Sequence, residues 1–210
     1  LPFSYLGLYK EESPLANDLR EILRAFVASR PDIGYIQGLS FIGGMLLLNM
    51  DKFRAFASLM NIVLNPSIFV FYTCEQSGIN KRISIFKQLL AYNLPDLAKR
   101  FEELEINPEY YLIEWIMTIF SKSLSIEIAT RIWDIFVYEG ITAIFSAAIV
   151  FLSHYEGKFL KMEYEDILKE IKTIGMINFD EEEIMAAIQK VKYPNKIKAE
   201  LDKIKDENIP

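Results

Sequence analysis

Cysteine and histidine are almost absent from this chain of 210 residues, which holds only Cys74 and His154. A single cysteine cannot form an internal disulfide bond, a pattern typical of proteins from reducing compartments. Because a Cys/His zinc site needs several such ligands, this class of metal site is excluded within the chain. We expect Cys74 to be a small buried apolar side chain rather than a nucleophile. We expect His154, which follows an apolar run, to be a partly buried residue at a helix end.

Basic residues are outnumbered, with 23 lysines and arginines against 29 acidic residues, a formal net charge of −6 and a pI of about 5.0. Proteins that bind nucleic acids or anionic lipid surfaces usually present a basic face. The apolar run at residues 141–155 is shorter than the roughly 20 apolar residues that span a bilayer. The sequence therefore predicts neither a nucleic-acid partner nor direct membrane insertion.

The common signatures of a self-contained active site are also missing. The sequence holds no glycine-rich phosphate loop, no Gly-x-Ser-x-Gly nucleophile turn and no His-Glu-x-x-His metal motif. If the chain takes part in catalysis, we expect it to contribute groups to the active site of a partner.

Apolar residues recur at helical rather than strand spacing, which predicts an all-α fold of one globular domain or of two lobes that share a core. A capping residue followed by proline marks helix starts at Ser13 and Asn107. Asp51 is expected to cap a helix that turns Phe53 inward and is broken at Asn65-Pro66. The other predicted helices cover residues 14–28, 39–50, 81–92, 95–105, from 109 onward, 126–139, 142–155, 161–173 and 180–192, with a surface helix or frayed end at 196–210.

Residues 30–38 read Arg-Pro-Asp-Ile-Gly-Tyr-Ile-Gln-Gly and are the most informative segment. Proline ends the preceding helix, and Gly34 and Gly38 permit the positive φ angles of a tight turn. Gln37 therefore lies between two apolar helices. Its amide has an acceptor oxygen and a donor NH₂, which suits holding a water while contacting a phosphate oxygen, as in GTP hydrolysis. Taken alone, such a segment more often marks a solvated or backbone-capping glutamine.

Two further segments make this turn part of an ordered set of three. Residues 115–121 read Trp-Ile-Met-Thr-Ile-Phe-Ser, and residues 131–136 read Arg-Ile-Trp-Asp-Ile-Phe and are followed by Glu139-Gly140. Together the three segments resemble the TBC domain, the GTPase-activating domain for Rab GTPases. The Tyr-x-Gln turn is similar to the family's second finger motif, and Arg-x-Trp-Asp with Glu-Gly is similar to its C-terminal hallmark. The resemblance extends from Leu1 to about Ala187.

The resemblance implies a two-lobed all-α fold whose N-terminal edge is truncated, with lobes at residues 1–105 and 106–210. TBC domains insert an arginine and a glutamine into the nucleotide site of the GTPase, and Gln37 matches the catalytic glutamine. The implied partner is a Rab-family small GTPase in its GTP form, which brings GTP and Mg²⁺, so the chain needs no cofactor of its own. The implied location is the cytoplasm, at the surface of intracellular membranes engaged in vesicle traffic.

The arginine finger is the point at which this chain departs from the family pattern. The family's first motif, Ile-x-x-Asp-x-x-Arg, precedes the segment that matches the start of this chain, which begins without a methionine and resembles an excised piece of a longer protein. Arg20, Arg24 and Arg30 belong to the helix that follows, and none stands in that motif. The arginine role is therefore assigned to no residue here, and we expect the arginine just upstream.

The remaining motif residues have structural interpretations. Trp115 and Trp133 are expected to be core anchors because each buries a large aromatic area. Arg131 and Asp134, three positions apart on one helix, are expected to pair with each other or with neighbours in a buried structural network. The alternative is that they shape the groove for the Rab. Gly140 is expected to end their helix.

Two residues of the glutamine turn are assigned supporting roles: Tyr35 is expected to brace the turn, and Asp32 to cap it. Three functions remain open. The parent protein accelerates GTP hydrolysis on a Rab through Gln37; or the fold binds a GTPase as a non-catalytic effector; or it is a helical scaffold without a GTPase partner.

Overall fold

The computed structural model describes residues 9, 13–174 and 180–207, and all the regular structure in these ranges is helical. The start of the family resemblance and the last three residues lie outside this part. Its helices are α1 (Pro14–Ser29), α2 (Leu39–Asn49), α3 (Lys52–Val63), α4 (Pro66–Tyr72), α5 (Gln76–Asn93), α6 (Pro95–Glu103), α7 (Glu109–Thr118), α8 (Ile126–Glu139), α9 (Ile141–Phe159), α10 (Tyr164–Lys172), α11 (Glu181–Lys190) and α12 (Asn195–Lys205).

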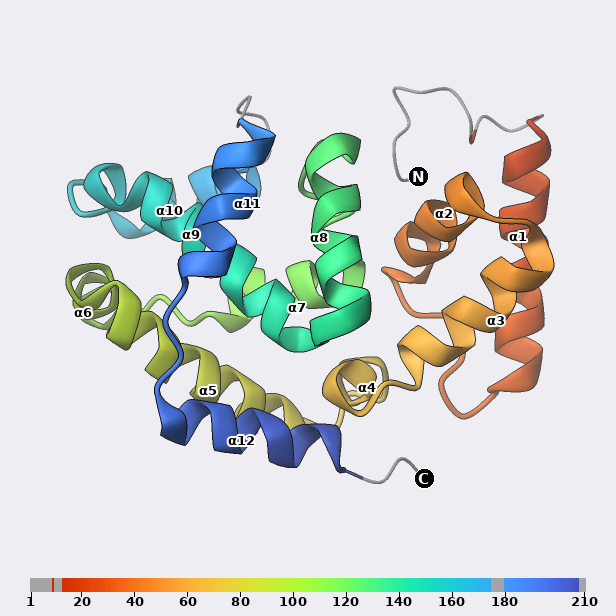
Figure 1. Cartoon of the computed structure of the whole chain (residues 1–210), viewed down its shortest axis with the longest axis horizontal. Helices are drawn as coiled ribbons and strands as arrows, with labels where there is room; N and C mark the ends of the chain where they lie inside the picture. Colours follow the sequence, from red (N-terminus) through yellow and green to blue (C-terminus); the bar gives the residue numbers. More distant parts are fainter. Residues whose placement is uncertain (1–8, 10–12, 175–179, 208–210) are drawn as a thin grey trace.

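The helices form two groups that meet at α4 and α7 (Figure 1). Helices α1, α2 and α3 pack against one another at one end of the molecule, and α2 and α3 contact α7 and α4. In the other group, α9 is buried along most of its length and contacts α5, α7, α8 and α11. Helices α5 and α6 pair with each other, and α12 covers α5 (Figure 1). The division into lobes at residue 105 stays a prediction; α5, from the first half, packs on α9 and α12 from the second.

Side-chain caps explain why several helices begin where the sequence predicts. The Ser13 hydroxyl accepts a hydrogen bond from the Ala16 backbone N–H at 3.2 Å, and the Asp51 carboxylate accepts from the first turn of α3. Such caps satisfy backbone donors that have no partner inside the helix. At Asn65 the prediction of a simple break is incomplete, because its side chain accepts from Ser67 N–H and starts the short helix α4.

Three predicted burial states outside the sequence motifs are wrong. Phe53 is 79% exposed, because the buried face of α3 is centred on Ala55, Leu59 and Val63 and Phe53 lies about 120° around the helix from that centre. Cys74 is exposed and lies, with φ 55°, in the turn between α4 and α5. His154 is exposed because α9 continues to Phe159 and buries a different face.

Arg82 of α5 is the buried charge that joins α4, α5 and the end of α12. Its side chain is fully buried and donates to the carbonyl oxygens of Ser67 at 2.7 Å, Pro66 at 2.6 Å and Gly78 at 3.1 Å. Its guanidinium also pairs with the Glu207 carboxylate at 2.7 Å. Because a buried guanidinium is costly unless its donors are satisfied, this residue holds the three segments in one arrangement.

Stability is expected to depend on the ionisation of Glu207. Burial is the largest single cause and raises its pKa, but the hydrogen bonds and positive charges of Lys81 and Arg82 together lower the pKa below the ordinary value of 4.5. A carboxyl group with a lowered folded-state pKa stabilises the fold above its unfolded-state pKa, and this contribution is lost as pH falls through the folded value. The difference in melting temperature between the unmodified protein and Glu207→Gln should narrow below about pH 4.5. A difference that stays constant into acid would contradict this.

Among the described residues, no single helix is long and apolar enough to cross a membrane; one sharply bent pair, α3 with α4, meets the length and composition criteria only when its two helices are taken together.

Candidate functional site

The turn that carries Gln37 is built as the sequence predicts. Helix α1 ends where the Arg30 N–H bonds to the Phe26 carbonyl at 2.9 Å, and Gly34 N–H then bonds to the Arg30 carbonyl at 2.9 Å. Gly34 and Gly38 have φ angles of 69° and 120°, which an L side chain rarely adopts. Gly38 is the N-cap residue of α2, so Gln37 lies directly before the positive end of that helix, with its side chain exposed.

The first part of the turn is held by an ion pair between Arg30 and Asp32. Arg30 Nε donates to Asp32 Oδ1 at 2.8 Å, and the guanidinium lies over the Phe69 ring of α4 at 5.6 Å from its centroid. The hydrogen bond from Arg30 is the largest cause that lowers the pKa of the Asp32 carboxyl, and the backbone N–H groups of Asp32 and Ile33 contribute. The predicted turn-capping role of Asp32 is consistent with this arrangement. Tyr35 is 57% exposed, so its bracing role stays a prediction.

A cavity of about 290 Å³ opens beside Gln37, between the start of α2 and one face of α7. Lys122, which follows α7, forms an ion pair with Glu114 in this lining. Two of the lining residues, Gln37 and Gly38, were predicted from the sequence as site residues. Met117 and Thr118 belong to the second motif segment but were given no place in the site, and the rest of α7 reads only as an amphipathic helix. The full lining is Gln37, Gly38, Phe41, Glu109, Tyr110, Ile113, Glu114, Met117, Thr118 and Lys122.

The tryptophans of the two later motifs are core residues, as predicted. Trp115 and Trp133 are 2% and 7% exposed. Trp115 lies between aromatic rings of the core, 4.9 Å from Tyr111 and 5.1 Å from Phe120 between ring centroids. Trp133 Nε1 donates to the Ile119 carbonyl at 3.1 Å and also lies 2.9 Å from the Ser121 hydroxyl oxygen. The helix α8 is therefore tied to the segment that follows α7.

The predicted buried network of Arg131 and Asp134 is wrong. Both side chains are exposed, because α8 buries the opposite face, which carries Ile128, Ile132 and Phe136. Arg131 instead pairs with Glu181 at the start of α11, with 3.0 Å between Nε and Oε1. Gly140 ends α8 with a φ of 65°, as predicted.

Replacing Gly38 with alanine is expected to lower the free energy of unfolding by about 3 kcal/mol. The new Cβ would meet the Met117 carbonyl oxygen at 3.3 Å, and the φ of 120° is strained for any residue with a Cβ. Gly34→Ala is the matched control, because a Cβ there meets no described atom within 4 Å and φ 69° costs only about 1 kcal/mol. Urea unfolding measures both changes, and equal losses would contradict the packing of Gly38 on α7.

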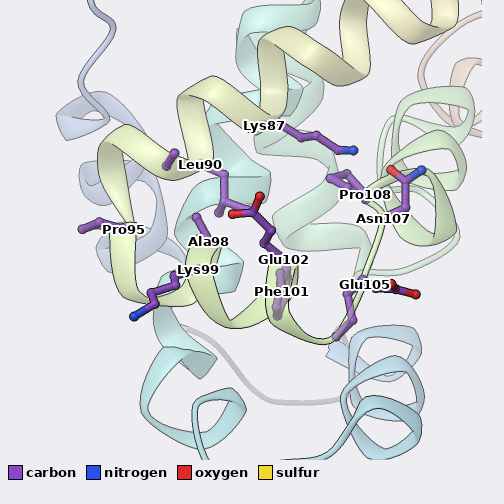
Figure 2. Close-up of a pocket in the computed structure, with 12 residues that line it drawn as sticks. Lys87, Leu90, Pro95, Ala98, Lys99, Phe101, Glu102, Glu105, Asn107 and Pro108 are labelled. Atoms are coloured by element: carbon purple, nitrogen blue, oxygen red, sulfur yellow. The ribbon is translucent and has the colours of Figure 1, made fainter.

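A second cavity, of about 530 Å³, lies away from this turn, between α5, α6 and the segment before α7. Figure 2 shows Lys87 and Glu102 extending toward the space, whereas Lys99 points away from it. Its lining combines apolar side chains with charged residues of both signs. Among the described residues, none of those that line this cavity belongs to the three sequence motifs. The candidate site is therefore the Gln37 turn and its cavity.

The family of the chain follows from its similarity to a known domain. The model of the Rab-GTPase-TBC domain matches residues 3–160, which is three quarters of the chain. The chain belongs to the Rab-GTPase-TBC domain family. In this TBC domain the matched region contains the Gln37 turn, both tryptophans and Gly140.

Curated relatives of the TBC domain are longer than this chain. Drainin of Dictyostelium discoideum is 33% identical over 189 residues, which is 90% of this chain and 43% of that protein. TBC1 domain family member 12 of Xenopus tropicalis is 35% identical over 162 residues, covering 77% of this chain and 24% of the relative. Human TBC1 domain family member 14 is 31% identical and is covered for 30% of its length. The chain thus spans less than half the length of these relatives.

Solved structures confirm the all-α TBC fold. The Chlamydomonas flagellar RabGAP TBC domain superimposes with a TM-score of 0.73 at 23% identity, covering 86% of this chain and 60% of that one. The Ypt/Rab-GAP domain of Gyp1p superimposes with a TM-score of 0.70 at 16% identity, covering 83% of this chain and 64% of that one. At these identities the likeness establishes the fold alone.

Proposed function

We propose that this TBC domain accelerates GTP hydrolysis by a Rab GTPase and that Gln37 is a catalytic residue supplied in trans. The observation that carries the proposal is the position of Gln37. It is an exposed amide on a turn fixed by two positive-φ glycines, at the lip of a cavity and directly before α2. Family membership supports a Rab GTPase as the partner.

The chemistry follows from the two ends of the amide. Its oxygen accepts a hydrogen bond from the attacking water, and its NH₂ donates to an oxygen of the phosphoryl group being transferred. The partial positive charge at the start of α2 favours the approach of that anionic group. In the cavity lining, Lys122 pairs with Glu114 and so reduces the negative charge that two glutamates would present to a phosphate.

The GTPase brings GTP and its Mg²⁺ in this proposal, and the TBC domain holds neither by itself. An arginine that neutralises the transferred phosphoryl group is required as well. We propose that an Ile-x-x-Asp-x-x-Arg motif upstream of Leu1 supplies this arginine. The proposed site of action is the cytoplasmic surface of intracellular membranes, where Rab-dependent vesicle traffic occurs.

One observation favours a second candidate, a TBC module that binds a GTPase as a non-catalytic effector or scaffold. Within the described residues, the lining of the Gln37 cavity includes no arginine. Arg30 is engaged by Asp32, and Arg20 hydrogen-bonds to Asn17 on α1. An arginine-free site would bind the GTP form without stabilising the transition state.

Phosphate release by a panel of GTP-loaded Rab GTPases tests the two functions. Two proteins are compared, this chain and a version extended upstream through any Ile-x-x-Asp-x-x-Arg motif. Acceleration by the extended protein alone supports the proposed activity and the upstream arginine. Binding of a GTP-loaded Rab by both proteins, without acceleration by either, establishes the effector role instead.

A further inference from the structure

The backbone that follows α7 is unusual. Helix α7 ends at Thr118, and the next two residues, Ile119 and Phe120, have φ angles of 46° and 60°. Bulky side chains avoid this left-handed region, and a β-branched residue such as isoleucine avoids it most. Both side chains are fully buried. Such a conformation persists only where the surrounding structure holds it, so the contacts of this turn are informative.

Two side chains from distant helices hold carbonyl groups at the end of α7. The Tyr72 hydroxyl, at the end of α4, donates to the Met117 carbonyl at 2.6 Å. The Trp133 indole, on α8, donates to the Ile119 carbonyl at 3.1 Å. Both donors are buried, and Tyr72 is fully so. The two hydrogen bonds fix the carbonyl groups on either side of Thr118.

The Met117 carbonyl is also the point at which α7 contacts the glutamine turn. A Cβ built on Gly38 would lie 3.3 Å from the Met117 oxygen and 3.5 Å from the Met117 Cβ, so the Gly38 backbone rests against this residue. Gln37, Gly38, Met117 and Thr118 line the same cavity. The Met117 carbonyl therefore lies between the Tyr72 hydroxyl and the residue that follows Gln37.

We propose that Tyr72 is a positioning residue for Gln37. The Tyr72 hydroxyl holds the Met117 carbonyl in place. Because Gly38 packs against that carbonyl, its position determines where the Gly38 backbone lies and hence the direction in which the Gln37 side chain projects. This inference rests on the proposed function, because its effect is measured on GTP hydrolysis. Trp133 holds the segment that follows α7 through its hydrogen bond to the Ile119 carbonyl.

The test is Tyr72→Phe, assayed with a GTP-loaded Rab as substrate in the full-length protein. The variant removes one hydroxyl and keeps the ring. Tyr193→Phe is the matched control, because the Tyr193 hydroxyl likewise donates to a backbone carbonyl, that of Thr142, at 3.0 Å, and also bonds to Ser146. Tyr193 lies in the segment between α11 and α12 and is not part of the Gln37 cavity lining.

We expect Tyr72→Phe to lower kcat by about tenfold and to leave KM nearly unchanged, because a small misplacement of a catalytic group affects mainly the chemical step. Tyr193→Phe should change kcat by less than about twofold. If the Tyr72 hydroxyl were only structural, both Tyr72→Phe and Tyr193→Phe would lower the thermal unfolding temperature, and neither would change kcat. If Tyr72→Phe does not fold, Trp133→Phe, which releases the Ile119 carbonyl, should show the same selective loss of kcat.

A double variant separates this inference from the proposed function. In Gln37→Ala/Tyr72→Phe, kcat should equal that of Gln37→Ala alone, because Tyr72 acts only through Gln37. If Gln37→Ala itself has no effect, the proposed function fails. If Gln37→Ala lowers kcat but Tyr72→Phe does not, or if the two losses multiply, the positioning role of Tyr72 is overturned and the proposed function stands.

Discussion

Replacing Gln37 with alanine is expected to lower the TBC-stimulated rate of GTP hydrolysis by the Rab by about 10²–10³-fold, the loss typical of removing one preorganised donor from a charge-developing transition state. The Gln37 amide is exposed. The backbone conformation of its turn is set by Gly34, Gly38 and the Arg30–Asp32 pair rather than by Gln37 itself. Removing it therefore leaves the fold and the docking surface in place. Single-turnover hydrolysis measures the rate, and the affinity for the GTP-loaded Rab should change by less than about threefold.

The control for this variant is Gln189→Ala. Gln189 is exposed, as Gln37 is, but it lies on helix α11 and is not in the Gln37 cavity lining. It should leave the hydrolysis rate unaltered. Equal rates for the Gln37 and Gln189 variants would show that the Gln37 side chain takes no part in the chemical step.

Replacing Arg82 with methionine is expected to lower the free energy of unfolding by about 3–5 kcal/mol, as for a buried ion pair that loses one partner. Methionine fills the space of the side-chain stem, but it leaves the Pro66 and Ser67 carbonyls without the Arg82 donor and the Glu207 carboxylate with Lys81 alone. Each buried acceptor left unsatisfied costs free energy. Guanidinium-induced unfolding measures the loss.

Lys81→Met is the matched control for Arg82. Lys81 is the neighbouring residue and pairs with the same carboxylate at 2.6 Å, but its side chain is 43% exposed. An exposed pair of this kind contributes about 0–1 kcal/mol. Comparable losses in the two variants would mean that the buried guanidinium is not what joins α4 and α5 to the end of α12.

The helix boundaries that could be predicted are those whose signals are local, whereas α5 begins at Gln76 rather than 81, α9 ends at Phe159 rather than 155, and the short helix α4 was not predicted. Ser13, Asp51 and Gly140 start or end helices through their own side chain or backbone, with no help from distant segments. The glycine-bracketed turn belongs to the same class, since positive φ at Gly34 and Gly38 follows from residue type. The all-α class and the position of Gln37 on an exposed turn were therefore readable from the sequence.

Burial could not be predicted where tertiary contacts decide it. Arg82 reads as a polar residue on an amphipathic helix, and its partner Glu207 lies 125 residues later. Tyr72 gives no signal for the glutamine turn, because the link runs through the Met117 carbonyl, 45 residues away. Conversely, Arg131 and Asp134 were read as buried because they belong to a family motif, although both are exposed.

The central claim, that Gln37 acts in the transition state of GTP hydrolysis, is tested most directly with a transition-state analogue. Aluminium fluoride added to a GDP-loaded Rab mimics the phosphoryl group during transfer, and a protein complementary to that state binds it more tightly than the ground state. The account predicts that the full-length protein binds the GDP–aluminium fluoride form more tightly than the GTP form, and that Gln37→Ala loses this preference. Tighter binding of the GTP form, unaffected by Gln37→Ala, would contradict the account and identify the domain as an effector.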